Sequence, residues 1–376
     1  MSKRIVPVLA CVLALSACLV TRPSEVHVVT APDASATGFG SAFSMDEQRL
    51  VARAVSEGSP VVYVFDAFGS GWEHTATISA PPTATDAWGS SVAVSGDTIA
   101  VADPYFPATG TVELGRVTLY SADGGAWAIA QQITAGQDWT SFAAGVWLSE
   151  RGLVVQSGAN CDSTCSVGTW TLYHRYGQFF SKAFQTSPGV GLSVGVDEGR
   201  FALGNPGGYD IDSYGRDNAL RVIDANVTLP HFILDEVVPL GDPYGTDPLT
   251  TDLFRKVDIS GDLLAYESCC SSDDRLHIRR FDGTTYQPEA TFPLDEQSES
   301  VVALPGLVMV ADPDEGEWHT YAFHDGEWKR SSDLPAPDHV AGKFEVPPVA
   351  VGDRVAVAGD GVIHILTVEV VEVEDD

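Results

Sequence analysis

The chain has 376 residues and carries 21 lysine and arginine residues against 52 aspartate and glutamate residues, a formal charge of −31. Nucleic acid is not an expected partner, because phosphate binding needs a basic surface. The length suits one large all-β domain or two domains of ordinary size.

A targeting segment is expected at the N-terminus. Two basic residues precede the apolar run Ile5–Leu15, which fits the core of a signal peptide and is too short to span a bilayer as a stable helix. The tetrapeptide that ends at Cys18, Leu-Ser-Ala-Cys, resembles the bacterial lipobox. The alternative is an ordinary cleaved signal with an unrelated cysteine.

The lipobox resemblance implies a lipoprotein signal peptide over residues 1–17 and lipidation of Cys18. We expect a tether over 18–24 and a location in the cell envelope, with the membrane contacted through the lipid anchor alone. Because Leu19 is not Asp, the resemblance further implies sorting to the outer membrane or cell surface.

One phrase recurs along the rest of the chain. WGSSVAVSGDTIAVADP (88–104) alternates small and apolar residues, turns at Gly96-Asp97 and alternates again. When the chain is aligned on the second strand of this phrase, which starts at Ile99, six counterparts follow the same pattern; they start at Leu50, Leu153, Phe201, Leu264, Val308 and Val355. Each copy continues with a third strand, a hairpin turn that is often Asp-Gly, and a fourth strand led by an aromatic residue. Asp-Gly suits the positive φ angles of a tight type I′ turn.

Four short antiparallel strands repeated seven times predict an all-β fold, a seven-bladed β-propeller. One such sheet cannot bury both of its faces, but neighbouring blades in a ring can. Small residues crowd the first strand of each copy, as an innermost strand near the axis requires. We expect a single domain over 25–371, followed by an acidic tail over 372–376, and a monomer.

The repeated phrases resemble the FG-GAP repeat family, the propeller module also found in integrin α subunits. The resemblance rests on FGS (39–41), on the phrase at 88–104 and on YVFDAFGSGW (63–72), and it covers residues 25–371. The calcium-binding version of the module carries Asp-x-Asp-x-Asp-Gly at the inner turn, and no copy in this sequence has it. The resemblance therefore implies the short-turn bacterial version without calcium at those turns.

The last copy lacks a fourth strand, so the ring must be closed from elsewhere. HVVTAPDASATGFGSAFS (27–44) aligns with TISAPPTATDAWGSSVAV (77–94), which predicts that Val26–Thr30 is the outer strand of blade seven. The alternative is that residues 368–374 close their own blade. Closure by the N-terminal strand would send the anchor at Cys18 out from the face with short hairpins. The long loops would then face away from the membrane.

Two motifs that suggest catalysis fit the repeat better. Ser193 lies in a G-x-S-x-G sequence, but the alignment places it with Ser91 on an inner strand and no helix pattern follows, so we do not expect a nucleophile elbow. SADGGAW (121–127) resembles an Asp box one residue short, and we interpret it as a hairpin turn with a packed tryptophan.

A calcium loop is the best metal candidate. Asp210, Asp212 and Asn218 occupy positions one, three and nine of an Asp-x-Asp-type loop that turns at a glycine, although Tyr214 at position five is a poor ligand. No other cofactor is expected.

Four cysteines follow Cys18. In an exported protein two local disulfides are expected, Cys161 with Cys165 and Cys269 with Cys270, because the two pairs belong to blades that do not touch. A zinc site would need all four cysteines together.

The sequence favours a non-enzymatic scaffold that binds a protein or a glycan through its loop-rich, acidic face. Exposed aromatic residues and acids in the predicted loops are the candidate contacts: Tyr105, Phe106, Tyr209, Tyr214, Tyr244, Asp312, Asp314 and Glu317. The alternatives are an enzyme, a glycosidase or lyase with paired carboxylates on the same face, and a structural part of an envelope complex.

Overall fold

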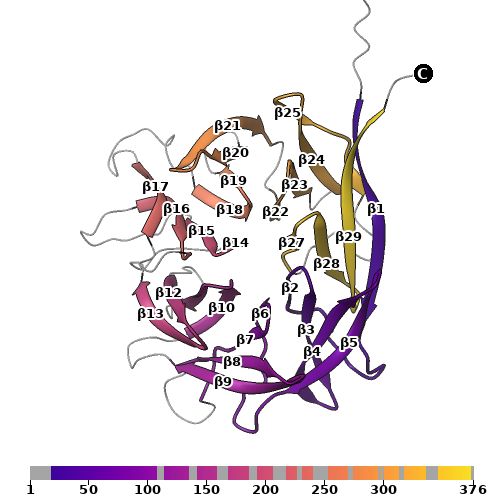
Figure 1. Cartoon of the computed structure of the whole chain (residues 1–376), viewed down its shortest axis with the longest axis vertical. Helices are drawn as coiled ribbons and strands as arrows, with labels where there is room; N and C mark the ends of the chain where they lie inside the picture. Colours follow the sequence, from indigo (N-terminus) through magenta and orange to yellow (C-terminus); the bar gives the residue numbers. More distant parts are fainter. Residues whose placement is uncertain are drawn as a thin grey trace, which may run out of the picture.

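The fold is a closed ring of seven β-sheets, seen in a computed structural model that describes residues 18–107, 114–134, 142–158, 168–185, 193–205, 217–226, 231–239, 253–269, 274–294, 298, 300–312, 317–335 and 346–373 (Figure 1). Each sheet is an antiparallel blade whose first strand lies nearest the axis. The predicted all-β, seven-bladed β-propeller is confirmed. The described residues form no helix, so none of them belongs to a helix long and apolar enough to cross a membrane.

The strands follow the chain blade by blade. Blades one and two hold β2 (Phe43–Met45), β3 (Arg49–Ser56), β4 (Ser59–Phe68), β5 (Gly71–Ser79), β6 (Val92–Ser95), β7 (Thr98–Asp103), β8 (Arg116–Asp123) and β9 (Ala126–Thr134). Blades three and four hold β10 (Phe142–Leu148), β11 (Gly152–Gly158), β12 (Gly168–Tyr176), β13 (Phe179–Gln185), β14 (Ser193–Asp197), β15 (Arg200–Asn205), β16 (Asp217–Asp224) and β17 (His231–Pro239). Blades five and six hold β18 (Leu253–Ser260), β19 (Leu263–Cys269), β20 (Arg275–Phe281), β21 (Tyr286–Pro293), β22 (Ser300–Leu304), β23 (Leu307–Asp312), β24 (Glu317–His324), β25 (Glu327–Arg330) and β26 (Leu334–Pro335). Blade seven holds β27 (Val349–Val351), β28 (Arg354–Gly359), β29 (Val362–Val373) and, from the other end of the chain, β1 (Cys18–Thr30).

Hydrophobic packing between neighbouring blades holds the ring together. In β7, Ile99 packs with Val51 and Val62 of blade one, while the next residue, Ala100, packs with Leu153 of blade three. Successive side chains of a strand point to opposite faces, so both faces of the strand are covered and all six residues of β7 are buried. This explains why the second strand of each copy is apolar almost throughout rather than alternating.

The N-terminal strand closes blade seven as predicted. β1 pairs with β29 in antiparallel register, with Val26 opposite Leu366, and it forms the outer strand of the sheet. The alternative closure by 368–374 is not what occurs, since those residues up to Val373 continue β29 as the third strand. The pairing begins at Cys18, so residues 18–24, where we expected a tether, are already part of the blade.

The first residues of β1 also contact blade six. The backbone N–H of Thr21 donates to Ser332 Oγ at 3.0 Å, and Thr320 donates to Thr21 Oγ1 at 3.0 Å. Leu19 is buried in a cluster that includes Trp318. We call Cys18–Arg22, the part of β1 that reaches blade six, the N-terminal latch. It joins the blade that closes the ring to the blade before it.

Candidate functional site

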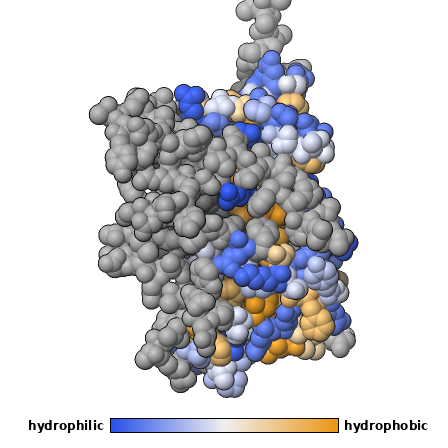
Figure 2. All heavy atoms as spheres, turned by 90° about the vertical axis from the view of Figure 1, so that its left-hand side faces the viewer, coloured by the Kyte–Doolittle hydropathy of each residue, from blue (hydrophilic) through white to orange (hydrophobic). Residues whose placement is uncertain are grey.

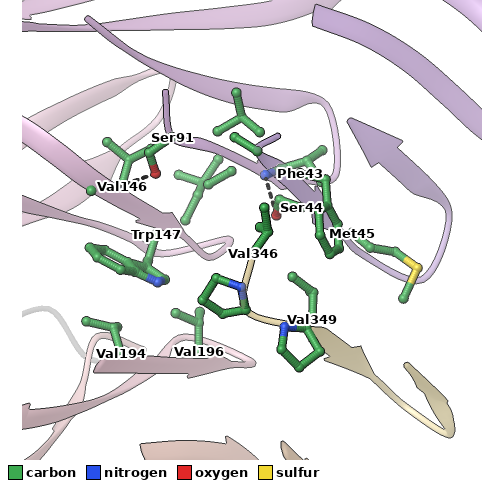
Figure 3. A pocket seen from close by; sticks show the side chains of 18 of the residues that line it. Phe43, Ser44, Met45, Ser91, Val146, Trp147, Val194, Val196, Val346 and Val349 are labelled. Carbon is green, nitrogen blue, oxygen red and sulfur yellow. Dashed lines mark hydrogen bonds between the residues drawn. The ribbon is translucent and has the colours of Figure 1, made fainter. Parts of the chain in front are cut away.

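A cavity of about 460 Å³ occupies the centre of the ring (Figure 3). The inner strands of blades one, two, three, four, five and seven contribute its walls, together with the segment that enters blade seven. Most of the residues that line this axial channel are small or apolar, among them Ala93, Val146, Val194, Val196 and Val349. Asp258 is the one charged residue among the described residues that line it.

The channel wall is built on hydrogen bonds between neighbouring inner strands. Ser91 Oγ of blade two accepts from the N–H of Val146 in blade three at 3.0 Å. Ser193 Oγ of blade four accepts from the N–H of Val257 in blade five at 2.9 Å and donates to the carbonyl of the same residue at 3.1 Å. The two serines that the repeat alignment equates therefore make the same contact, and the Ser193 hydroxyl is held by backbone rather than by a histidine.

Two further positions of the repeat make equivalent bonds. Two residues after the serine position, Ser44 accepts from Val94 at 3.2 Å and Asp258 accepts from Ala303 at 2.9 Å. Two residues later again, an aspartate accepts from the turn glycine of the next blade, as Asp46 does from Gly96 at 2.7 Å. We call these bonds the inter-blade clasps; their acceptors are Ser44, Asp46, Ser91, Ser193, Asp197 and Asp258.

The clasps provide hydrogen-bond acceptors for the inner edge of each blade. An innermost strand has one edge without a partner strand, and its buried N–H groups must find acceptors. Alternate side chains of the preceding inner strand all point toward that edge, because the side-chain period of a strand is two. Short polar side chains at alternate positions supply the acceptors that a neighbouring strand would otherwise give.

The clasp at Ser300 is incomplete. Ser300 occupies the same place in blade six as Ser91 and Ser193, and its Oγ is buried without a hydrogen-bond partner among the described residues. The residue of blade seven that should donate is Pro348, which has no N–H. The proline therefore explains the orphaned hydroxyl.

The Asp258 carboxyl group at the channel wall has a raised pKa. Its side chain is enclosed by blades five and six and only partly exposed, and this burial raises its pKa to about 7. Backbone N–H groups of Ala303 and Ile259 lower the pKa, and the charge of Asp197 raises it. Burial also raises the pKa of Asp197, which accepts from the N–H of Gly261. Asp258 is thus poised between its neutral and ionised forms near neutral pH.

Trp147 stands in blade three where Ser44 and Asp258 stand in their blades. Its ring packs against Trp170 with centroids 5.3 Å apart in an edge-to-face arrangement, and Val194 and Val196 of blade four pack against the same buried cluster. Figure 3 shows Trp147 beside these two valines at the border of the cavity. Sequence reasoning missed both Trp147 and Asp258, although their common place in the repeat was a usable signal.

The predicted contact residues Tyr105 and Phe106 lie at the start of the β7–β8 loop, where residues 104–107 rest on a buried ion pair. Asp103 and Arg116 form a fully buried ion pair at 3.1 Å, and Thr85 also donates to Asp103. The Arg116 guanidinium lies 3.7 Å from the centroid of the Phe106 ring. Phe106 is therefore largely used in internal packing, whereas 47% of Tyr105 remains exposed.

Two other predicted contacts face each other across blade six. Asp312 ends β23 and Glu317 begins β24, and the two are paired in register. Asp312 Oδ2 lies 3.2 Å from His319 Nε2, and the other ring nitrogen of His319 lies 2.9 Å from Asp333. Asp312 thus belongs to a network within its own blade.

Several predicted residues lie outside the described residues. These are Cys161, Cys165, Asp210, Asp212, Tyr209, Tyr214, Tyr244, Cys270 and Asp314. Cys18, Asn218 and Cys269 are described in their backbone as parts of β1, β16 and β19, but not in their side chains. Within the described part of the chain, no group of three or more His, Cys, Asp or Glu residues is arranged to hold a metal ion.

Hairpins of the third and fourth strands expose apolar side chains at the other end of the blades. Tyr176 is 54% and Phe179 62% exposed at the β12–β13 hairpin. Figure 2 views the ring from its edge, where hydrophobic residues of the described surface lie among hydrophilic ones. This hairpin is a useful counterpart to Tyr105, because it presents a similar side chain at the opposite strand end.

Seven antiparallel blades, six of four strands and one with a short fifth strand, surround an axial channel and define the class of protein, a seven-bladed β-propeller. No family model matches the chain, and no curated protein matches its sequence. Solved structures do resemble it. The WD40 domain of Toxoplasma gondii coronin has a TM-score of 0.55 at 10% identity, over 96% of this chain and 87% of that one.

Two bacterial structures are similar to about the same degree. A candidate 6-phosphogluconolactonase from Bacteroides fragilis has a TM-score of 0.51 at 12% identity, over 85% of this chain and 95% of that one. A protein from Lactobacillus plantarum has a TM-score of 0.50 at 11% identity, over 80% of this chain and 86% of that one. At such low identity the likeness shows the propeller fold alone.

Proposed function

We propose that this protein is a non-enzymatic propeller lipoprotein of the FG-GAP-like, short-turn kind. In this proposal Cys18 carries the lipid that anchors it in the cell envelope, and the loop-rich, acidic face binds a protein or a glycan. The two sources of support are the fixed loop at Tyr105 and the position of the strand end at Cys18.

The loop at Tyr105 is the observation that carries the binding function. The buried Asp103–Arg116 pair and the stacking of Arg116 on Phe106 hold the described start of the loop, residues 104–107, while Tyr105 projects into solvent. A segment that is already held in place loses little conformational entropy when it binds, and tyrosine is favoured at interfaces because it combines apolar area with a polar tip. Rigid support beneath an exposed aromatic residue is typical of a recognition loop.

The pairing of β1 supports the proposed orientation. Cys18 is paired with Val373 at the end of β29, the strand end at which the other blades have hairpins such as β12–β13. Tyr105 follows the end of β7, at the opposite end of the blades. An anchor at Cys18 is therefore compatible with a loop face that points away from the membrane.

The enzymatic alternative needs two carboxylates that face one cleft. Asp258 faces the channel and has the raised pKa that an acid catalyst needs, but Asp197 is not among the residues that line the cavity. Each of these aspartates accepts a backbone N–H in a clasp. The described lining of the cavity therefore holds a single carboxylate, that of Asp258, and this carboxylate has a structural role. Both points favour a binding function over hydrolysis.

A matched pair of variants tests the binding function. Tyr105→Ser removes the proposed anchor, and Tyr176→Ser removes an equally exposed tyrosine at the hairpin end. Lipidated protein is cross-linked in its native envelope, and the captured partner is quantified. We expect Tyr105→Ser to reduce capture about tenfold or more, as loss of a binding hot spot does, and Tyr176→Ser to leave it unchanged. Equal capture by both variants would refute the role of the loop face.

A further inference from the structure

The axial channel has the properties of a small-molecule site. Its volume of about 460 Å³ lies within the range of ligand pockets, and apolar side chains share its walls with polar backbone and hydroxyl groups. Val194 and Val196 from blade four and Val346 and Val349 from blade seven lie around the same space as Trp147 (Figure 3). An apolar molecule placed there would displace water from these walls, which favours binding.

The polar groups of the wall determine which apolar molecule fits. Ser44 and Ser91 are already used by the clasps. Asp258 also accepts a clasp N–H, but it is the one charged residue of the described lining, and burial has removed part of the hydration of its carboxylate. A cation beside it would compensate for that loss, and the acidic chain as a whole raises the local concentration of cations.

We propose that the axial channel binds a small apolar molecule that carries one ammonium group. The ammonium group lies at the Asp258 carboxylate, and the apolar part lies against the valines and Trp147. This site is separate from the loop face at Tyr105, and it does not depend on the lipid anchor.

The proposal implies a pH dependence with a definite sign. The strands packed most closely against β18 carry Asp197 on β14, Arg200 on β15 and Glu267 on β19, and β18 itself carries Arg255 and Lys256, whereas β22 contains no charged residue. Of these charges, that of Asp197 raises the pKa of Asp258. The ammonium group favours the ionised form of Asp258, so binding releases a proton while that carboxylate is still protonated. Affinity should therefore rise with pH up to about one pH unit above the pKa of Asp258, and then level off.

Calorimetric titration with hexylamine, which is protonated over this pH range, and with hexanol as the uncharged probe tests the proposal. We expect wild-type protein to bind hexylammonium about tenfold more tightly near pH 8 than near pH 5, and to bind hexanol independently of pH. Asp258→Asn should lose about tenfold in affinity for hexylammonium and none for hexanol. Trp147→Leu should weaken both probes. Asp197→Asn, which changes a carboxylate outside the cavity lining, should keep pH-dependent binding of hexylammonium.

Asp258→Ser is the second variant, because blade one has a serine at the same place of the repeat and that serine still forms its clasp. It should behave as Asp258→Asn does. The proposal fails if wild-type protein does not bind hexylammonium, or if both Asp258 variants bind it as tightly as the wild type does. It fails equally if affinity does not change with pH.

Discussion

At the level of single residues, the inter-blade clasps connect the repeated sequence to the ring. Ser91 and Ser193 each satisfy an N–H of the next blade, whereas Ser300 at the equivalent place meets Pro348 and has no donor. The three serines differ only in whether the next blade has a backbone N–H that can donate to the hydroxyl. They form a natural comparison for measuring what a clasp contributes.

Removing the three hydroxyls one at a time should give unequal results. Ser91→Ala and Ser193→Ala each leave a backbone N–H without an acceptor and should lower the free energy of unfolding by about 1–3 kcal/mol. Ser300→Ala removes a buried hydroxyl that has no partner and should be neutral or stabilising. Urea denaturation of the three variants measures this. Equal losses for all three would show that the clasps do not contribute as described.

Asp258 should make stability depend on pH in the direction opposite to an ordinary ion-paired aspartate. Its pKa is about 7 in the folded protein and 3.8 as the reference value, so the folded state holds the proton more tightly. Stability is therefore lost as pH rises from about 4 to about 7, and it stays lost above that range. Asp258→Asn should be more stable than wild type at pH 8 by up to about 4 kcal/mol, since one pKa unit corresponds to about 1.4 kcal/mol.

Urea unfolding of both proteins at pH 4 and pH 8 provides the measurement. The difference between Asp258→Asn and wild type should grow with pH and nearly vanish at pH 4. A difference that is the same at both pH values would contradict the assigned charge state.

At the level of elements, the N-terminal latch makes β1 more than a closing strand. Leu19 is 7% exposed and packs in the cluster between blades six and seven, while Val28 of the same strand is 57% exposed. Leu19→Ala should lower the free energy of unfolding by about 2 kcal/mol or more, because it leaves a cavity beside Trp318. Val28→Ala should have almost no effect.

Hydrogen exchange complements the unfolding measurement for this pair. Leu19→Ala should increase the exchange of β24 and β29 amides, which flank the cluster, and Val28→Ala should not. If both variants behave alike, the latch does not hold blade six.

Much of the element pattern could be predicted from the sequence, because it is local. The Asp-Gly turn at Asp325-Gly326 has φ angles of 52° and 82°, as a type I′ hairpin requires. The Asp-Gly at Asp282 behaves differently: its carboxylate accepts from the N–H groups of Thr284 and Thr285, and the hairpin is longer. The same dipeptide therefore allows two turns, and the following residues decide between them.

The features that sequence reasoning missed depend on contacts that are distant in the chain. CLVTRPS (18–24), with its proline and polar residues, is predicted as a tether, yet its partner strand lies at the other end of the chain. Phe106 was expected to be free, but Arg116 occupies its ring face. Asp258 looked like one acid among many, and only the packing of blades five and six reveals its burial.

At the level of the whole molecule, the ring separates two ends with different surfaces. One end carries the hairpins and the N-terminal residue of β1, and the other carries the supported loop at Tyr105. The axial channel with Asp258 lies between them. A fold that is held together by contacts between neighbouring blades leaves its loops free to vary, so binding can be assigned to one end without disturbing the ring.

Site-specific photo-cross-linking in the native envelope tests the central claim, that the loop face is the binding face, most directly. A photoreactive residue is placed at position 105 or at position 176 of the full-length protein, and the adducts are compared. We expect a discrete adduct with a protein or glycan from position 105 and none of the same mass from position 176. A discrete adduct from position 176 alone would contradict it.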